Sequence, residues 1–424
     1  MTPFSQLFLT FLRIGLLSFG GPAAQIALLH REIVEERGWL TERQYLQALS
    51  FCMLLPGPEA MQLATWAGWR LRGVAGGLLA GGLFVLPGAL VIAVLALLYS
   101  SYGTRPEIAG LMLGVKATVI ALVAQALLKL ARKVLTSRSA LLIAVSAFAA
   151  LYVLHAPFPL VIACAALVGW LGTDRAAPAE VQPVPAPVTE RIWVWPLWVT
   201  LWFAPMVIAG LAGQTLLYEI GMLFSKLAVF SFGGAYAVLA WLAQEAVTAR
   251  GWLAPAQMAD ALGLAETTPG PLILVTQFVG MITGFAAGGW PMALAAGAMV
   301  LWVTFIPCFL WIFAFAPHLE RLLARPRLQG ALGAITAAVL GVIANLTLWF
   351  ALHVLFAETR IPAFGPLAPE LPVPASLRPG ALALTLLAAV LLGPLRRSVP
   401  LTLAVTAGAA FALIHSSAYS ISFY

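Results

Sequence analysis

Apolar segments of about 20 residues follow one another through almost the whole chain, and only short polar joints separate them. A segment of that length is what an α-helix needs to cross the hydrocarbon core of a bilayer. Hydrophobic residues make up 62% of the 424 positions and charged residues 9%, with a mean hydropathy of +0.97, so a charged outer shell cannot form. The least apolar stretches, 173–191 and 358–379, are proline-rich and too short for a soluble domain. The sequence therefore predicts an all-α integral membrane protein.

The distribution of charge and of metal-binding side chains excludes several other classes of protein. The net charge is +7, but lysine and arginine stand singly or in small groups at segment ends, which is typical of topology signals and not of a nucleic-acid surface. Cys52, Cys164 and Cys308 lie in separate segments, and the five histidines are scattered. We therefore expect no disulfide framework, no metal site, no cofactor and no nucleic-acid partner.

A long segment of the chain occurs twice. Residues 11–58 align without a gap on 224–271, a shift of 213, with 20 identities in 48 positions. Identical residues cluster as Ser-Phe-Gly-Gly from Ser18 and Ser231, as Arg-Gly-Trp-Leu from Arg37 and Arg250, and as Pro-Gly-Pro from Pro56 and Pro269. We predict a first repeat at 1–173, a linker with a connecting span at 174–216, and a second repeat at 217–424.

Both repeats show the same order of segments. An apolar segment broken at Gly-Gly is followed by a charged amphipathic stretch ending at Gly-Trp-Leu, and then by a second apolar segment broken at Pro-Gly-Pro. Uninterrupted helices are expected after each copy, at 73–99, 107–130, 139–155 and 158–172 in the first repeat and at 290–316, 329–356, 380–394 and 399–415 in the second. A further span is expected near 193–215. The total is about 13 segments.

Positive charge predicts opposite orientations for the two repeats. Arg70 and Arg72 precede the helix at 73, whereas neutral residues 284–289 precede its counterpart and three arginines, Arg321, Arg325 and Arg327, follow it. The first helix therefore begins inside and its counterpart ends inside. This predicts inverted repeats, an N-terminus inside and a C-terminus outside, an arrangement typical of carriers that hold substrate between broken helices near the midplane.

The Gly-Gly pairs, Gly20-Gly21 and Gly233-Gly234, give the backbone freedom to stop a helix in mid-membrane. Ser18 and Ser231 precede them and could bind substrate. The alternative is that the glycines only allow helices to pack closely. Because the same motif occurs in both copies, we favour a role at the substrate site.

Each Pro-Gly-Pro motif predicts a helix break followed by a new helix N-terminus inside the membrane. Such an N-terminus presents unpaired N–H groups and the positive end of the helix dipole, which together bind anions. The alternative is a simple kink. The candidate substrate residues of these motifs are Pro56, Gly57, Pro58, Thr267, Thr268, Pro269, Gly270 and Pro271.

A few charges lie inside apolar segments, where they are costly and functional by default. Arg13 and Lys226 align, each before its Gly-Gly pair, and we predict that they face the substrate; the alternative is snorkelling to the interface. Glu59 and Glu266 do not align and are candidates for ion coupling. The partner of Lys116 is left open. The duplicated Glu32, Arg37, Glu245 and Arg250 are interpreted as solvated or salt-bridged residues of the amphipathic stretches.

These motifs, in duplicate and in this order, resemble the chromate ion transporter family in its long, two-domain form. The resemblance rests on Phe19-Gly20-Gly21-Pro22, on Gly38-Trp39-Leu40, on Pro56-Gly57-Pro58 and on the second copy from Phe232 to Pro271, and it covers nearly the whole chain. The second copy departs from the pattern, with Ala235 in place of proline and Leu272 in place of Glu59.

The resemblance implies export of chromate across the bacterial inner membrane and chromate resistance, with sulfate as the natural look-alike. The alternatives are a sulfate or related oxyanion carrier without a resistance role, a channel, and a membrane-embedded enzyme. The last is disfavoured because the apolar segments hold no nucleophile–base set. The expected partners are a small inorganic oxyanion and the lipid bilayer, and the oligomeric state is left open.

Overall fold

The computed structural model describes residues 2–19, 21–103, 105–172, 194–232, 235–318, 325–362 and 368–415. The chain forms two compact units, and each unit draws on both sequence repeats. Unit 1 comprises Met1–Leu97, Trp170–Val238 and Thr268–Leu332, and unit 2 comprises Leu98–Gly169, Leu239–Thr267 and Gly333–Tyr424. The compact units therefore do not coincide with the repeats.

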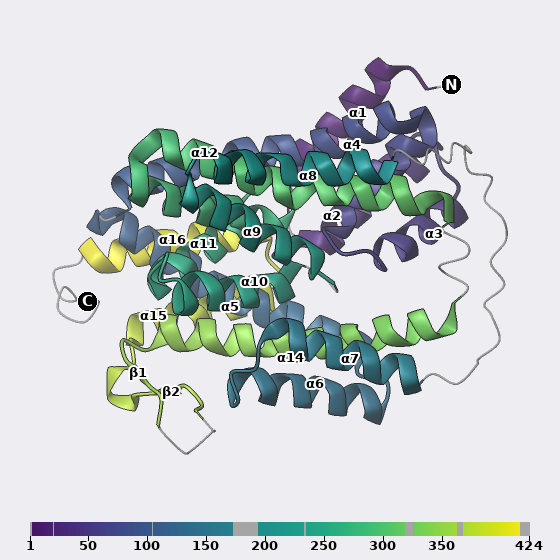
Figure 1. Cartoon of the computed structure of the whole chain (residues 1–424). Helices are drawn as coiled ribbons and strands as arrows, with labels where there is room; N and C mark the ends of the chain where they lie inside the picture. Colours follow the sequence, from purple (N-terminus) through teal and green to yellow (C-terminus); the bar gives the residue numbers. More distant parts are fainter. Residues whose placement is uncertain are drawn as a thin grey trace. The chain divides into compact units, whose positions relative to one another are not determined.

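Unit 1 holds the beginnings of both repeats. Its helices are α1 (Phe4–Leu17), α2 (Gly21–His30), α3 (Glu42–Cys52), most of α4 (Glu59–Tyr102), α8 (Val194–Leu211), α9 (Thr215–Val229) and α12 (Val275–Phe315). Helices α8, α9 and α12 pack together in Figure 1. Indole groups join them, because Trp202 donates to Ser225 Oγ at 3.1 Å and Trp302 donates to the Leu201 carbonyl at 2.7 Å.

The long helices α4 and α12 bend at equivalent places. In α4 the helical backbone is interrupted at Arg72 and Gly73, and in α12 at Gly288 and Gly289. Gly73 and Gly289 have φ angles of 63° and 65°, which favour glycine. The helices predicted to begin at 73 and 290 are confirmed, and each follows a shorter helix that begins at a Pro-Gly-Pro motif.

Unit 2 is a helical bundle built around α5 (Pro106–Val134), which packs against α11 (Pro255–Thr267), α15 (Pro379–Leu392) and α16 (Val399–His415). Small residues allow these backbones to approach closely. A Cβ atom on Gly114 would lie 2.4 Å from the Thr406 carbonyl oxygen, and the Thr118 and Thr406 hydroxyls lie 2.6 Å apart. The remaining helices are α6 (Arg138–Tyr152), α7 (Phe158–Gly172), most of α14 (Pro326–Leu355) and the end of α10 (Ala235–Ala243).

The stretch between α14 and α15 contains the only strands among the described residues. β1 (Thr359–Arg360) pairs with β2 (Leu371–Pro372) in an antiparallel ladder, with Thr359 opposite Pro372. The N–H of Ala368 donates to the Val153 carbonyl at 3.0 Å, which ties this hairpin to the turn between α6 and α7. The hairpin is short, as expected for a stretch without a domain of its own.

The helices confirm an all-α membrane protein. Within the described part, four have the length and composition to cross a membrane: Glu59–Tyr102, Glu107–Val134, Leu272–Phe315 and Pro326–Leu355. Seven further apolar helices are shorter. The total of 13 segments and the inverted arrangement of the repeats remain predictions.

Candidate functional site

All four predicted helix breaks occur where the motifs place them. Helix α1 ends at Leu17 and α2 begins at Gly21, while α9 ends at Val229 and α10 begins at Ala235. The Pro-Gly-Pro motifs separate α3 from α4 and separate α11 from a 3₁₀ turn that leads into α12. Gly20, Gly233 and Gly234 lie outside the described residues, so the breaks at Gly-Gly are defined by the helix ends on either side.

Two reciprocal hydrogen bonds join the breaks within unit 1. The N–H of Gly57 donates to the Ser231 carbonyl at 3.1 Å, and the N–H of Gly270 donates to the Ser18 carbonyl at 3.0 Å. Gly57 aligns with Gly270 and Ser18 with Ser231, so each Pro-Gly-Pro turn binds the Gly-Gly break of the other copy. We call these four residues and the turns that carry them the break layer.

The glycines of the break layer are required by the backbone conformation. Gly57 has φ 126° and Gly270 has φ 90°, values that side chains rarely allow. Gly21 has φ 78°, and a Cβ atom there would meet nothing within 4 Å. Close helix packing therefore does not explain Gly21, and the conformational interpretation of the motif holds at this position.

Two buried glutamines, which the sequence did not single out, complete the layer. Gln25 donates through Nε2 to the Gly270 carbonyl at 2.6 Å and to the Ser18 carbonyl at 3.3 Å. Gln62 donates to the Pro56 carbonyl at 2.7 Å, and its amide oxygen is buried without a hydrogen-bond partner in the described part of the chain. An unpaired buried acceptor is uncommon and marks a place where water or a ligand can bind.

Three of the four hydroxyl groups predicted to bind substrate cap their own helices in this conformation, and the fourth residue, Thr268, is buried. Ser18 Oγ donates to the Ile14 carbonyl at 2.6 Å, Ser231 Oγ to the Ala228 carbonyl at 2.9 Å, and Thr267 Oγ1 to the Leu264 carbonyl at 2.8 Å. A hydroxyl has one proton to donate. These groups satisfy carbonyls left open at helix ends, and an anion would have to displace those bonds to receive their protons.

The two aligned cations lie on the outer faces of α1 and α9. Arg13 has 53% of its side chain exposed, and its Nε lies 3.5 Å from Glu32 Oε1. Lys226 is also exposed. Glu59, in unit 1, and Glu266, in unit 2, are both half-buried. The structure thus brings the Gly-Gly and Pro-Gly-Pro motifs together without turning Arg13 toward them.

The duplicated Glu–Arg motif forms the same local structure in both copies. A π-helical turn contains each glutamate, at Arg31–Glu35 and at Gln244–Ala249, and such turns are rare and frequent at functional sites. Glu32 pairs with Arg37 at 2.5 Å, and Glu245 pairs with Arg250 at 3.3 Å. Each arginine also lies over a tryptophan ring, at 5.6 Å for Trp39 and 4.9 Å for Trp252. The salt-bridge interpretation is confirmed.

The two copies differ in how deeply this glutamate is buried. The side chain of Glu32 is fully buried, and it faces Arg13, Arg31 and Arg37. The side chain of Glu245 remains 26% exposed, and it receives hydrogen bonds from Arg250 and from the Trp241 indole. A fully buried carboxylate depends more strongly on cationic partners than a partly exposed one, so the charge cluster of the first copy depends more on its ion pairs.

A second charged group lies in unit 2, where the structure supplies the partner of Lys116 that the sequence left open. Lys116 on α5 has its Nζ 3.0 Å from Oδ1 of Asp260 on α11. Asp260 went unnoticed because its segment, Pro255–Thr267, is only moderately apolar. The available signal was the alignment, in which Asp260 stands where the first copy has Gln47.

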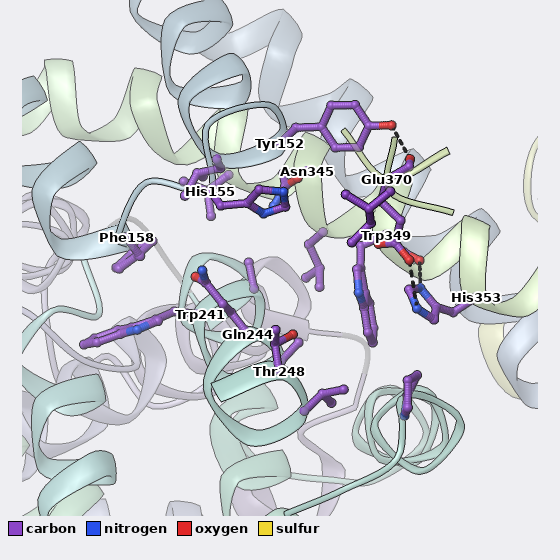
Figure 2. Close-up of a pocket in the computed structure, with 18 residues that line it drawn as sticks. Tyr152, His155, Phe158, Trp241, Gln244, Thr248, Asn345, Trp349, His353 and Glu370 are labelled. Atoms are coloured by element: carbon purple, nitrogen blue, oxygen red, sulfur yellow. Dashed lines mark hydrogen bonds and ion pairs between the residues drawn. The ribbon is translucent and has the colours of Figure 1, made fainter. Parts of the chain in front are cut away.

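Unit 2 also contains a cavity of about 250 Å³, between the ends of α6 and α14, the π-helical turn at Gln244–Ala249 and the β-hairpin (Figure 2). His353 Nε2 lies 3.3 Å from Glu370 Oε1, and His155 Nε2 lies 2.6 Å from the Ala368 carbonyl oxygen. The lining contains one carboxylate and no lysine or arginine, a composition that disfavours an inorganic dianion. No group of three or more metal-ligating side chains occurs among the described residues.

Comparison with known proteins gives a consistent result along the chain. The family described as "Chromate transporter" matches residues 5–170 and 218–414. A "Chromate transport protein" of Pseudomonas aeruginosa is 34% identical over 81% of this chain and 80% of its own length, and one of Cupriavidus metallidurans is 30% identical over 80% of both chains. A "Probable chromate transport protein" of Synechococcus elongatus is 32% identical over 80% of this chain and 82% of its own length. No solved structure matches the chain.

Proposed function

The chain belongs to the chromate transporter family, and from this we propose that it is a secondary carrier that exports chromate across the bacterial inner membrane and so confers resistance. The relatives are named as transport proteins, which favours transport over an enzymatic reaction. Sulfate, a tetrahedral dianion like chromate, is the competing substrate.

We propose that the two repeats have inverted topology. The reciprocal hydrogen bonds of the break layer support a two-fold relation between the copies, and the opposite distribution of arginine around the helices at 73 and 290 favours its inverted form. The guanidinium of Arg72 contacts the Thr2 carbonyl and the Phe4 ring, so the start of α1 and the bend of α4 lie at one end of unit 1. That end carries positive charge, as a cytoplasmic end does.

Reporter fusions test the topology. Reporters placed after Arg138 and after Gln329 should both be cytoplasmic, because arginine or lysine clusters lie beside these positions. A reporter after His415 should be periplasmic, since 13 spans place the two ends on opposite sides. A cytoplasmic reading after His415 would contradict an odd number of spans and with it the inverted arrangement.

We place the anion beside the break layer. A dianion removed from water needs opposite charge or many hydrogen-bond donors, because burying it uncompensated is prohibitive. The helices that begin after Pro58 and Pro271 supply N–H groups and dipole ends. The irregular backbone at Gly57 and Gly270 carries this proposal, because such backbone inside a membrane is tolerated where it lines a binding cavity. Arg13 and Lys226 attract the anion toward the layer from exposed positions.

Counterflow in proteoliposomes tests both the function and the cations. Vesicles loaded with unlabelled chromate should accumulate labelled chromate transiently and saturably, with sulfate as a competitor, whereas a channel gives no counterflow. Arg13→Gln and Lys226→Met should each weaken apparent affinity by about tenfold, the effect of removing a nearby positive charge that raises the local concentration of the anion. Arg31→Gln, which also removes an exposed arginine near Glu32, is the matched control and should transport normally. Unchanged affinity in both variants would identify Arg13 and Lys226 as interfacial anchors.

A further inference from the structure

Asp260 in unit 2 is held by two groups from neighbouring helices. Lys116 Nζ lies 3.0 Å from one carboxylate oxygen, and the Tyr99 hydroxyl donates to the other at 2.7 Å. Only 9% of the Asp260 side chain and 16% of the Lys116 side chain are exposed. Lys116 lies within Glu107–Val134, one of the described helices that are long and apolar enough to cross a membrane. The pair is therefore an intramembrane ion pair.

The repeated fold does not require this ion pair. The first copy has neutral Gln47 at the position of Asp260, and the second repeat has neutral Thr336 at the position of Lys116, because α5 and α14 align from Pro106 and Pro326. Removing two charges from water is expensive, and a well-packed apolar pair is often at least as stable. Lys116 comes from the first repeat and Asp260 from the second, and the equivalent positions carry no charge, so the pair points to a role other than holding the helices together.

We propose that Asp260 is a proton-binding counterion that competes with the transported oxyanion for Lys116. While Asp260 is ionised, it neutralises the lysine. When Asp260 takes a proton from water, Lys116 becomes an uncompensated cation in a medium of low dielectric constant, where attraction to an anion is strong. Proton binding and oxyanion binding therefore favour each other. This proposal rests on the proposed function and adds Lys116 as a cationic position for the anion beyond the break layer.

The groups around Asp260 allow Lys116 to change its partner from the carboxylate to an oxyanion. Among the described residues, its titratable contacts are Lys116 from α5 and Tyr99 from the end of α4. Helix α16, which also packs against α11, has His415 at its end as its titratable group, and α11 itself carries Glu266 six residues further on. Lys116 is thus the one cation in contact with Asp260 in the described structure, and its charge is available whenever the carboxylate is neutral.

The test measures chromate affinity against pH for the full-length reconstituted protein. Asp260→Asn should remove the part of the pH dependence that belongs to the protein. At pH 8 this variant should bind chromate about tenfold more tightly than wild type, because a tenfold change in affinity is typical of coupling between linked sites. The titration of chromate itself affects every variant equally. Lys116→Gln should weaken binding by about tenfold and flatten the pH dependence as well. Gln47→Asn, at the equivalent position of the first copy, is the matched control and should behave as wild type.

A milder variant guards against failure of the charge variants to fold. Tyr99→Phe removes only the hydrogen bond to the carboxylate, so the ionised form is less favoured and the midpoint of the pH dependence should move to higher pH. An unmoved midpoint would overturn the proposal, as would a wild-type pH profile in Asp260→Asn. Recovery of wild-type transport and pH dependence in the Lys116→Gln/Asp260→Asn double variant would assign the pair a structural role. Absence of chromate binding by the wild-type protein would instead refute the proposed function.

Discussion

A Gly57→Ala protein is expected to lose nearly all transport and to unfold at a markedly lower temperature than wild type. At φ 126° an alanine is strained by about 1 to 3 kcal/mol. The added Cβ atom would lie 2.7 Å from Gln62 Nε2 and 2.9 Å from Cys308 Sγ. Relief of either contact shifts the turn and weakens the hydrogen bond from Gly57 to Ser231, which contributes roughly 1 kcal/mol.

The matched control for this variant lies in the helix that follows the turn. Gly82 is a helical residue of α4, and a Cβ atom there would meet nothing within 4 Å. Gly82→Ala should therefore leave transport intact and stabilise the helix by about 0.5 to 1 kcal/mol. Thermal unfolding in detergent measures the stability of each variant, and counterflow in proteoliposomes measures its transport. Normal transport by Gly57→Ala would show that the break layer tolerates a regular turn and would remove it as the binding region.

A Glu32→Gln protein is expected to lose about 3 kcal/mol of stability, the upper end for a hydrogen bond to a charged group. Glu32 is fully buried, and its carboxylate receives Arg37 while Arg13 and Arg31 lie within 4 Å. The amide neutralises none of the three guanidinium groups. Their partial exposure lets water screen the remaining repulsion, so the loss should come mainly from the buried contact with Arg37.

The second copy supplies the control for Glu32. Glu245→Gln removes a carboxylate that is 26% exposed and paired with a single arginine, so its cost should be about 1 kcal/mol or less. The comparison is made by thermal unfolding of both variants under the same conditions. Equal losses would contradict the inference that the π-helical turn of the first copy organises a buried charge cluster.

Local sequence signals predicted much of the fold. Helix breakers define the ends of α1, α3, α9 and α11, and identical motifs form identical turns, as Gly38 and Gly251 show with φ angles of 60° and 61°. The capping glutamines also repeat, since Gln44 accepts from the Thr41 N–H and Gln257 from the Ala254 N–H. These features depend on residues a few positions apart, so they can be predicted from one sequence without knowledge of long-range contacts.

The missed features depend on contacts between distant parts of the chain. Gln25 bonds to Gly270, 245 positions away, and Asp260 bonds to Tyr99, 161 positions away. A lone polar residue in an apolar segment has no periodicity that reveals its partner. The hydroxyl of Ser18 shows the converse case, because a residue in a repeated motif can donate its proton to a carbonyl at its own helix end.

Chromate accumulation in inverted inner-membrane vesicles tests the central claim most directly. A dianion gains roughly 4.6 kcal/mol per 100 mV on entering a positive lumen, and a dianion that moves with one proton gains roughly 2.3 kcal/mol. Vesicles containing this protein should accumulate chromate when their lumen is made positive, saturably and in competition with sulfate. Accumulation no greater than in vesicles without the protein, at every imposed potential, would contradict the claim that the chain exports chromate.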